Sequence, residues 1–436
     1  MSIEPPKPQS LPAVPESLLP REHALYRPRH GKRQHTALTL AVLFFCLPAF
    51  LLVAGVRPAE FENRQLAAFP SITDGWGFFT GMEKWAADHL PLRSQAVAAA
   101  DGISRGVFGE PYPFGQKRDT GPVPGSVPEQ QAQDEPLTGV EIPRASGFPV
   151  VVEGQDGWLF LGYDVQAACQ PNKTVDEVFG ALNRLRAGVE ASGREFVLVV
   201  APNKATVVPE RLPASYLGSK CYDKARDEFW RRLAPETGAL DLRDDLGTAA
   251  AKLGGPVYSK IDTHWTHEGG LVMVRAIAEA VEPGSTARWR ETKAAVVDVP
   301  GDLPTLFGRT QTRPVQTYDL APDGRTVRSK QVRDNLREPK RFTLPAGAGG
   351  VKPKVGLIGD SFAFTVASYF VGGFSDVSLV HSDLVGTDPA RVGRMLAEQD
   401  VVVLEAVERS LVGGINTALS DSAVDAIVRE LAERPR

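Results

Sequence analysis

Three residues in two short stretches could together carry out acyl-transfer chemistry. Asp262 and His264 lie two positions apart in "YSKIDTHWTHEGG", and Ser361 follows an apolar run in "KVGLIGDSFAF". A serine hydroxyl is a weak nucleophile, so an imidazole must take its proton during attack, and a carboxylate must orient the imidazole and stabilise its charged form. These residue types therefore suggest a nucleophile, a general base and a carboxylate that orients this base.

Each of these residues also has a simpler interpretation. Ser361 or Asp360 at a helix start would commonly serve as an N-cap, and a single histidine is often structural. A metal site is a further alternative, because Asp262, His267 and Glu268 carry ligand atoms. The other histidines beyond residue 57 are scattered along the chain (His89, His264, His381). We therefore expect no metal.

The elements expected around these residues would bring them to one edge of a sheet. The run 355–358 predicts a strand, Gly359 a tight turn, and residues 361–371 a helix. Thr266 could cap a second helix over about 266–282, directly after Asp262 and His264. The carboxyl ends of parallel strands form the crevice in which open α/β sheets hold ligands. Backbone N–H groups at the helix start, beginning with that of Ser361, could stabilise an oxyanion there.

The remaining pattern between residues 147 and 436 alternates between strand and helix. "FPVVVEGQDGWLFLG" predicts a hairpin, and "FVLVVAP" a buried parallel strand. Further strands are expected at 376–381 and 400–407, and further helices at about 174–192, 222–235, 389–398 and 422–433. Residues 285–350 interrupt this rhythm with short alternating runs and predict a β-rich excursion. The whole indicates an α/β fold, a parallel sheet flanked by helices.

The N-terminal region predicts a single transmembrane helix. Residues 36–56, "TALTLAVLFFCLPAFLLVAGV", carry no charge, and about 20 apolar residues are enough to cross a bilayer. Basic residues precede this run (Arg21, Arg27, Arg29, Lys32, Arg33), whereas Arg57 is followed by Glu60 and Glu62. The positive-inside rule then places residues 1–35 in the cytoplasm and the rest of the chain outside. A cleaved signal peptide is the alternative, although it would have a shorter apolar core close to the N-terminus.

Two segments of different character lie between this helix and the α/β domain. Residues 57–115 show mostly helical spacing and predict a juxtamembrane pair of helices broken at Pro91. Residues 116–146 are rich in Pro, Gly, Gln and acidic residues, which bury too little apolar surface to order the chain. We expect a disordered insertion there, followed by a catalytic domain over 147–436.

Charge and cysteine content narrow the class of protein. With 49 Lys and Arg against 53 Asp and Glu, the net charge of -4 leaves no basic excess for nucleic acid. Cys46 lies in the apolar run, so Cys169 and Cys221 are the only pair outside it. An oxidising compartment would allow these two to form a disulfide, and two unpaired buried thiols are the alternative.

Several motifs resemble those of the alginate O-acetyltransferase family of the AlgX and AlgJ type, whose domain is SGNH hydrolase-like. The most specific is "DTHW" (262–265) followed by "GDSF" (359–362), because in that family the Asp and His precede the Ser. Similar in kind are "FENRQLAAFP" (61–70), "DHLPLR" (88–93), "GWLFLG" (157–162), "APNK" (201–204), "GDLPTLFG" (301–308) and "EAVERSL" (405–411). The resemblance runs in order along most of the chain after residue 60, apart from 116–146.

The resemblance implies an SGNH-like (flavodoxin-like) fold with Ser361 as nucleophile, His264 as base and Asp262 as its partner. Asn203 is then a candidate oxyanion donor, with turn capping as the alternative. Arg409 is a candidate for binding a sugar or carboxylate, with a salt bridge to Glu405 or Glu408 as the alternative.

The resemblance also implies an activity. Members of that family move acetyl groups onto hydroxyls of extracytoplasmic polysaccharides and commonly receive them through a membrane-bound O-acyltransferase. We therefore expect a single-pass protein of the cell membrane whose periplasmic domain acetylates an envelope or secreted polysaccharide through an acyl-serine, without a cofactor. A carbohydrate acetyl esterase of the same fold would differ only in using water as acceptor. A non-catalytic scaffold that binds glycan is a third hypothesis.

Overall fold

The computed structural model describes residues 32–54, 56, 69–71, 75–89, 99, 102–103, 106–107, 148–306, 309–332, 336–345 and 347–436. The described residues up to 89 belong to one compact unit, and those from 99 onward belong to a second, larger unit. Most of the expected cytoplasmic tail and all of the expected insertion at 116–146 lie outside the described residues.

The smaller unit contains two described helices, α1 (Lys32–Val53) and α2 (Trp76–His89). By length and mean hydropathy, none of the helices within the described part of the chain qualifies as a membrane span. The anchor expected over 36–56 therefore stays a prediction. Of the two helices expected on either side of Pro91, α2 covers the first, and most of the second falls outside the described residues.

A six-stranded sheet lies at the centre of the larger unit. Its strands, in spatial order, are β4 (Leu240–Asp241), β3 (Glu195–Ala201), β10 (Val401–Val407), β8 (Val355–Gly359), β9 (Asp376–His381) and β7 (Lys340–Thr343). The first five run parallel, and β7 pairs antiparallel with β9 at the edge. Every residue of the central strand β10 is buried, as expected for a parallel strand covered on both faces. The α/β prediction is confirmed, with the correction that the sheet is mixed.

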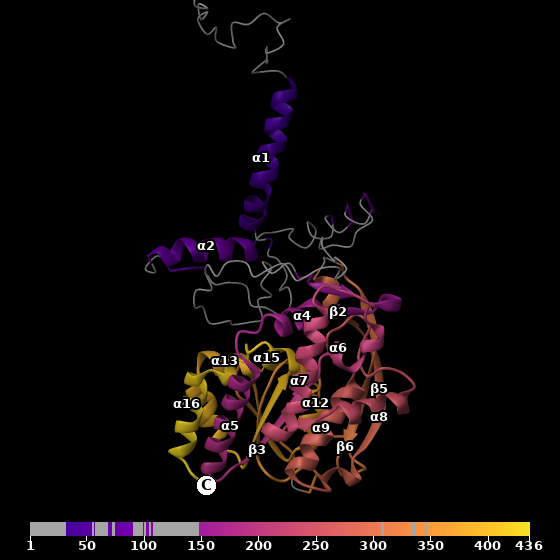
Figure 1. The fold of residues 1–436 in the computed structure, drawn as a ribbon, viewed down its shortest axis with the longest axis vertical. Helices are drawn as coiled ribbons and strands as arrows, with labels where there is room; N and C mark the ends of the chain where they lie inside the picture. Colours follow the sequence, from indigo (N-terminus) through magenta and orange to yellow (C-terminus); the bar gives the residue numbers. More distant parts are fainter. Residues whose placement is uncertain are drawn as a thin grey trace, which may run out of the picture. The chain divides into compact units, whose positions relative to one another are not determined.

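Two groups of helices flank this sheet, and Figure 1 shows the sheet between them. One group consists of α5 (Val175–Ala191), α14 (Pro389–Leu396) and α16 (Asp421–Ala432), and the other of α8 (Arg243–Leu253), α9 (His267–Val281) and α12 (Ala367–Gly373). The single helix expected over 361–371 is wrong. The structure has α11 (Ser361–Phe364) and then α12, because Thr365 bonds the carbonyl of Phe362 through its hydroxyl and Val366 leaves helical geometry.

Two antiparallel ribbons extend from this core. The hairpin of β1 (Val151–Glu153) and β2 (Leu159–Leu161) forms where the sequence predicts it. Its turn includes Asp156 and Gly157 at positive φ, a conformation that favours glycine. The longer ribbon, β5 (Arg290–Pro300) with β6 (Thr312–Ala321), carries the short helix α10 (Asp302–Thr305) between its strands. These elements and β7 lie within 285–350, the range of the expected β-rich excursion.

A disulfide joins two helices beside the sheet. Cys169 ends α4 (Gly162–Cys169), Cys221 lies in the first turn of α7 (Ser219–Thr237), and the two are bonded. Of the two alternatives for this pair, the structure has the bridge. Because the bond closes a loop of 52 residues, it restricts the unfolded chain and stabilises the folded unit.

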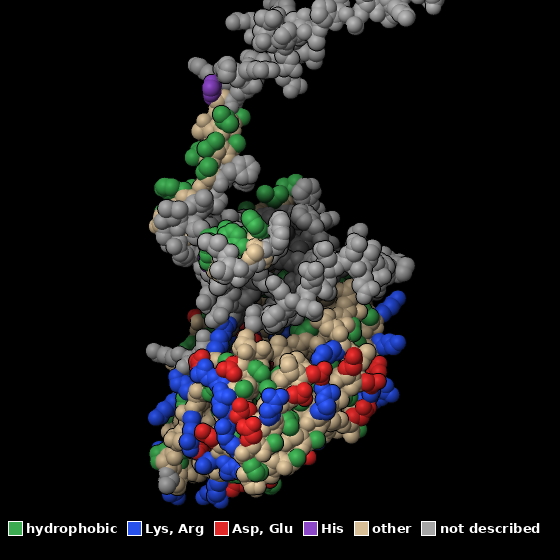
Figure 2. Space-filling model, turned by 90° about the vertical axis from the view of Figure 1, so that its left-hand side faces the viewer, with side chains coloured by type: hydrophobic (Ala, Val, Ile, Leu, Met, Phe, Trp, Pro, Cys, Tyr) green, Lys and Arg blue, Asp and Glu red, His purple; other side chains and the backbone are tan. Residues whose placement is uncertain are grey.

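The described surface of the larger unit carries both charge signs. On the face shown in Figure 2, Lys and Arg side chains are interspersed with Asp and Glu. Exposed ion pairs among the described residues include that of Arg211 with Asp156. Exposed pairs contribute at most about 1 kcal/mol each. The stability of the unit therefore comes mainly from its buried core, whose largest fully buried side chains include Tyr222, Tyr369, Phe160 and Phe229.

Candidate active site

Ser361, His264 and Asp262 meet at the carboxyl edge of the sheet. Ser361 begins α11 directly after β8, while the other two residues lie in the loop that precedes α9. The Nε2 atom of His264 is 2.9 Å from the Ser361 hydroxyl oxygen, and its Nδ1 atom is 2.8 Å from an Asp262 carboxylate oxygen. The imidazole thus connects a hydroxyl on one side with a carboxylate on the other.

The turn before α11 leaves the Ser361 hydroxyl free to face His264. Asp360, not Ser361, is the N-cap: its carboxylate accepts from the Phe362 N–H at 2.9 Å and from the Val407 N–H at 2.8 Å. The Asp360 N–H in turn donates to the fully buried Glu405 at 2.9 Å. The simpler interpretation of Ser361 as a helix cap is therefore wrong.

The loop that carries Asp262 and His264 is held from several directions. The ammonium of Lys204, on α6 (Lys204–Val207), donates to the carbonyl of Asp262 at 2.7 Å and to that of Ser259 at 3.0 Å. The Thr263 N–H donates to Asp302 on α10 at 2.8 Å. These contacts come from two separate parts of the chain, α6 and α10, and they fix the backbone from which the carboxylate and the imidazole project.

The charges around His264 tune its basicity. Burial alone would lower the pKa of His264, but the hydrogen bond and charge of Asp262 and the charge of Asp302 raise it above its ordinary 6.5. Burial alone would raise the pKa of Asp262, yet His264 and Arg313 lower it well below its usual range. The second carboxylate oxygen of Asp262 lies 3.0 Å from the guanidinium of Arg313 on β6. Asp262 is therefore ionised and holds the imidazole in the tautomer that presents Nε2 to the serine.

Asn203 and Arg409, the other two candidates, lie at the same edge of the sheet. Asn203 is 1% exposed, and its side chain makes no capping hydrogen bond to α6, so the turn-capping alternative is wrong. The side-chain amide oxygen of Asn203 has no hydrogen-bond partner among the described residues. The guanidinium of Arg409 lies 5.4 Å from the centre of the Phe362 ring and 3.8 Å from the carboxylate of Asp164. The expected salt bridge to Glu405 or Glu408 is wrong, because Asp164 is the partner.

A metal at His267 and Glu268 does not match their contacts. His267 is 2.7 Å from the hydroxyl of Tyr369, and Glu268 accepts from the hydroxyl of Tyr318 at 2.7 Å. Among the described residues, the group whose ligand atoms lie together is Asp262, His264 and Asp302, within 4.8 Å of one another. The Nδ1 atom that a metal would need there already pairs with Asp262.

Sequence reasoning missed Lys204, Asp302 and Arg313. Lys204 lies in "APNK" and Asp302 in "GDLPTLFG", so the motifs that carry the resemblance contained a signal for both. Arg313 lies outside these motifs, and its position beside Asp262 depends on how the β5 and β6 ribbon folds back onto the sheet.

Comparison with known proteins identifies the family of this chain. The family model described as "SGNH hydrolase-like domain, acetyltransferase AlgX" matches residues 151–377, just over half of the chain. The chain belongs to this family. The matched range includes Asp262, His264 and Ser361, so the resemblance inferred from the sequence motifs is confirmed.

The curated relatives carry the description "Probable alginate O-acetylase AlgJ". The protein from Pseudomonas putida is 30% identical over 211 residues, which cover 47% of this chain and 50% of the relative. The one from Pseudomonas aeruginosa is 28% identical over 224 residues, covering 49% and 53%. The chain thus spans about half the length of the curated relatives it matches.

Solved structures of the family show more distant similarity. The O-acetyltransferase domain of Pseudomonas putida AlgJ is 23% identical, with a TM-score of 0.44 over 66% of this chain and 100% of that chain. Pseudomonas aeruginosa AlgX is 18% identical, with a TM-score of 0.42 over 63% of this chain and 67% of that one.

Proposed function

We propose that this protein is an O-acetyltransferase that acetylates hydroxyls of a cell-envelope or secreted polysaccharide through an acyl-Ser361 intermediate. The observation that carries the proposal is the contact chain from the Ser361 hydroxyl through His264 to Asp262, with distances of 2.9 Å and 2.8 Å. Both distances are within the range expected for a serine, its general base and the carboxylate that orients that base.

The reaction would take place in two transfers. Ser361 Oγ attacks the carbonyl carbon of the acetyl donor while His264 Nε2 takes the hydroxyl proton, and that proton then passes to the leaving group. A sugar hydroxyl attacks the acetyl-serine next, His264 takes its proton, and the released Ser361 oxygen regains it. The N–H of Ser361 and the side chain of Asn203 are the candidate donors to the oxyanion in both steps.

A polysaccharide acceptor is supported by the relatives named as alginate O-acetylases. Acyl transfer to a sugar and hydrolysis by water use the same three residues. They differ in whether the acyl-serine is protected from water until the acceptor is positioned. An experiment that separates the two reactions has to supply an acetyl donor and vary the sugar acceptor.

The uncharged run over 36–56 supports anchoring of the protein in the cell membrane with its larger unit outside. The disulfide between Cys169 and Cys221 is consistent with an oxidising compartment such as the periplasm. In this placement the acetyl group has to cross the membrane, and a membrane-bound O-acyltransferase is the partner we propose for that step.

The test uses the full-length protein in a non-ionic detergent with an acetyl ester donor, with and without candidate oligosaccharides. Mass spectrometry follows acetyl gain on the sugar, and free acetate is measured in parallel. We expect a sugar mass gain that is lost in Ser361→Ala and in His264→Ala. Free acetate alone, unchanged by any sugar, would assign an esterase instead, and the absence of both products would favour a scaffold without catalytic activity.

A further inference from the structure

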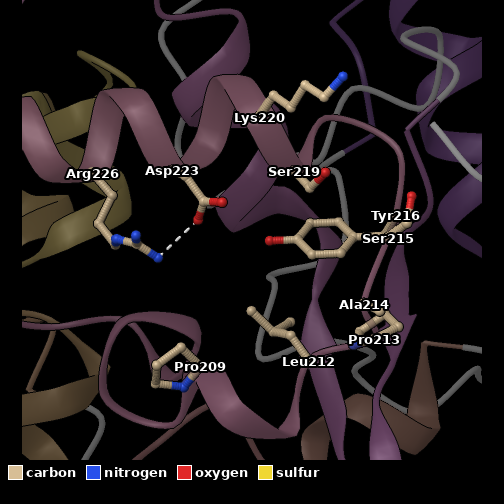
Figure 3. Close-up of a pocket in the computed structure, with 10 residues that line it drawn as sticks. All are labelled: Pro209, Leu212, Pro213, Ala214, Ser215, Tyr216, Ser219, Lys220, Asp223 and Arg226. Atoms are coloured by element: carbon tan, nitrogen blue, oxygen red, sulfur yellow. Dashed lines mark ion pairs between the residues drawn. The ribbon is translucent and has the colours of Figure 1, made fainter. Parts of the chain in front are cut away.

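A cavity whose lining includes none of the three catalytic candidates lies between the N-terminal half of α7 and the loop that precedes it (Figure 3). Its volume is about 510 Å³, a size typical of small-molecule sites. Pro209 and Leu212 line one side, and Ser219, Asp223 and Arg226 of α7 line the opposite side.

Tyr216 presents an unpaired hydroxyl to this cavity. The residue is only 7% exposed, and Figure 3 shows its hydroxyl directed into the space below Asp223. Within the described part of the chain this hydroxyl makes no hydrogen bond. Burial, and then the charge of Asp223, raises the pKa of Tyr216, so the group stays protonated and can donate. The Tyr216 hydroxyl opens onto the cavity, so a ligand bound there can accept its hydrogen bond.

An ion pair beside this hydroxyl offers both an acceptor and a donor. Arg226 lies 2.9 Å from Asp223, and Figure 3 marks this pair. A second pair with Asp227 at 2.9 Å and the Tyr222 ring at 5.6 Å hold the guanidinium in place. The Asp223 side chain is 53% exposed, so its carboxylate is still accessible to a ligand.

The walls of the cavity are held rigidly. The disulfide fixes Cys221, in the first turn of α7, to α4. On the opposite wall, the carbonyl of Leu212 accepts from the side chain of Gln155 at 3.0 Å, and Arg211 pairs with Asp156 at 2.7 Å. A cavity held in this way needs little ordering when a ligand enters, which favours affinity.

We propose that this cavity is an accessory site for one pyranose unit of the acceptor polysaccharide. The inference rests on the proposed function, which makes a glycan the acceptor. The Tyr216 ring with Pro209 and Leu212 supplies an apolar surface for the C–H face of a sugar ring. The Tyr216 hydroxyl donates to the sugar, and Asp223 and Arg226 accept from and donate to adjacent sugar hydroxyls. An acyl chain would leave these polar groups unpaired, and a phosphate would meet the Asp223 carboxylate, so a carbohydrate suits this set of groups best.

Asp164 connects the accessory site electrostatically with the catalytic candidates. Its carboxylate pairs with Arg409 at 3.8 Å, and its charge also contributes to the raised pKa of Tyr216. A polymer long enough to reach from this cavity to Ser361 would raise the local concentration of acceptor hydroxyls near the acyl-serine.

The test measures binding directly, with the full-length protein in detergent and without acetyl donor, so that no turnover occurs. Isothermal titration calorimetry with an alginate hexasaccharide and with a neutral glucan hexasaccharide gives the Kd of each. We expect binding of at least one of these probes, and Tyr216→Phe and Asp223→Asn should each raise its Kd roughly tenfold, as for a lost hydrogen bond to a ligand. Glu228→Gln on the same helix is the matched control, because it changes a similarly exposed carboxylate outside the cavity.

The outcomes separate this site from the proposed function. A raised Kd in both variants, with the control unchanged and melting temperatures intact, supports the site even if no sugar becomes acetylated. Wild-type binding that neither variant weakens would overturn the site, and so would an absence of wild-type binding to both hexasaccharides. If Tyr216→Phe lowers the melting temperature, the Kd of Asp223→Asn alone is used to test the site.

Discussion

The buried carboxyl group of Glu408 makes the stability of the protein depend on pH in a way that can be measured. Glu408 is 1% exposed at the start of α15 (Glu408–Val412), where it accepts from the Asn203 N–H at 2.8 Å and from the Thr206 hydroxyl at 2.7 Å. Burial, only partly offset by these hydrogen bonds, raises its pKa from 4.5 to about 7. One pKa unit corresponds to about 1.4 kcal/mol, so this difference corresponds to about 3 kcal/mol.

The direction of the effect follows from proton binding. Below pH 4.5 Glu408 is protonated in both the folded and the unfolded chain, and it imposes no penalty. Between pH 4.5 and about 7 the unfolded chain releases this proton while the folded chain keeps it, so the free energy of unfolding falls as the pH rises. Above pH 7 the whole penalty is present.

Glu408→Gln should remove this pH dependence. One amide oxygen can accept both hydrogen bonds that Asn203 and Thr206 now make to the same carboxylate oxygen, so the variant should keep the local fold. Urea unfolding followed by tryptophan fluorescence between pH 4.5 and 8 gives the free energy of unfolding of both proteins. Relative to Glu408→Gln, the wild type should lose about 3 kcal/mol across this range, and Glu228→Gln should behave as the wild type does. Parallel profiles for the wild type and Glu408→Gln would show that Glu408 does not cause the loss of stability.

Three further predictions concern the site and the disulfide. Asp262→Asn should keep the fold and lower acetyl-ester turnover by about 10⁴-fold, because the imidazole takes the wrong tautomer. Since Asp262 raises the pKa of His264, the acid limb of the pH–rate profile should also move to lower pH in this variant. Arg313→Met should lower kcat by about 10- to 100-fold, the usual effect of losing a hydrogen bond to a charged group. Arg313→Lys should restore part of this kcat. An unchanged kcat in Arg313→Met would show that Arg313 is not needed to hold the Asp262 carboxylate in place. Replacing Cys169 and Cys221 by Ser should lower the free energy of unfolding by about 4 kcal/mol, as the 52-residue loop implies. Urea unfolding under oxidising conditions measures this difference. Equal urea midpoints for the wild type and the double variant would show that the disulfide contributes nothing.

Much of the fold could be predicted from the sequence because its information is local. The buried strands β3, β8 and β10 form where continuous apolar runs predict them, and helix α5 begins at the Thr174 cap. Prediction was less accurate where contacts of individual side chains override the local pattern. The stretch after Ser361 has a helical pattern throughout, yet the helix is interrupted at Val366, next to the hydrogen bond of the Thr365 hydroxyl to the Phe362 carbonyl.

The candidate site was predictable only in part. Asp262, His264 and Ser361 could be selected because their types, their order and the adjoining elements agree with one chemistry. The ion-pair partners of the charged residues could not be predicted, since Arg409 pairs with Asp164 rather than with the glutamates near it in sequence. Capping could not be assigned either, because Asp360 and Ser361 are both good caps and the positions of Phe362 and Val407 decide between them.

Local sequence is enough to assign most strands and helices and to name the residue types at the carboxyl edge of the sheet, since hydrophobic periodicity and motifs extend over only a few residues. The ionisation and orientation of these groups depend instead on the packing of distant segments. Lys204, Asp302 and Arg313 come from distant parts of the chain to surround Asp262 and His264. Hydrogen bonds and ion pairs depend on distances of about 3 Å, and distances between segments so far apart in sequence are set only when the sheet, the ribbon and the helices pack together.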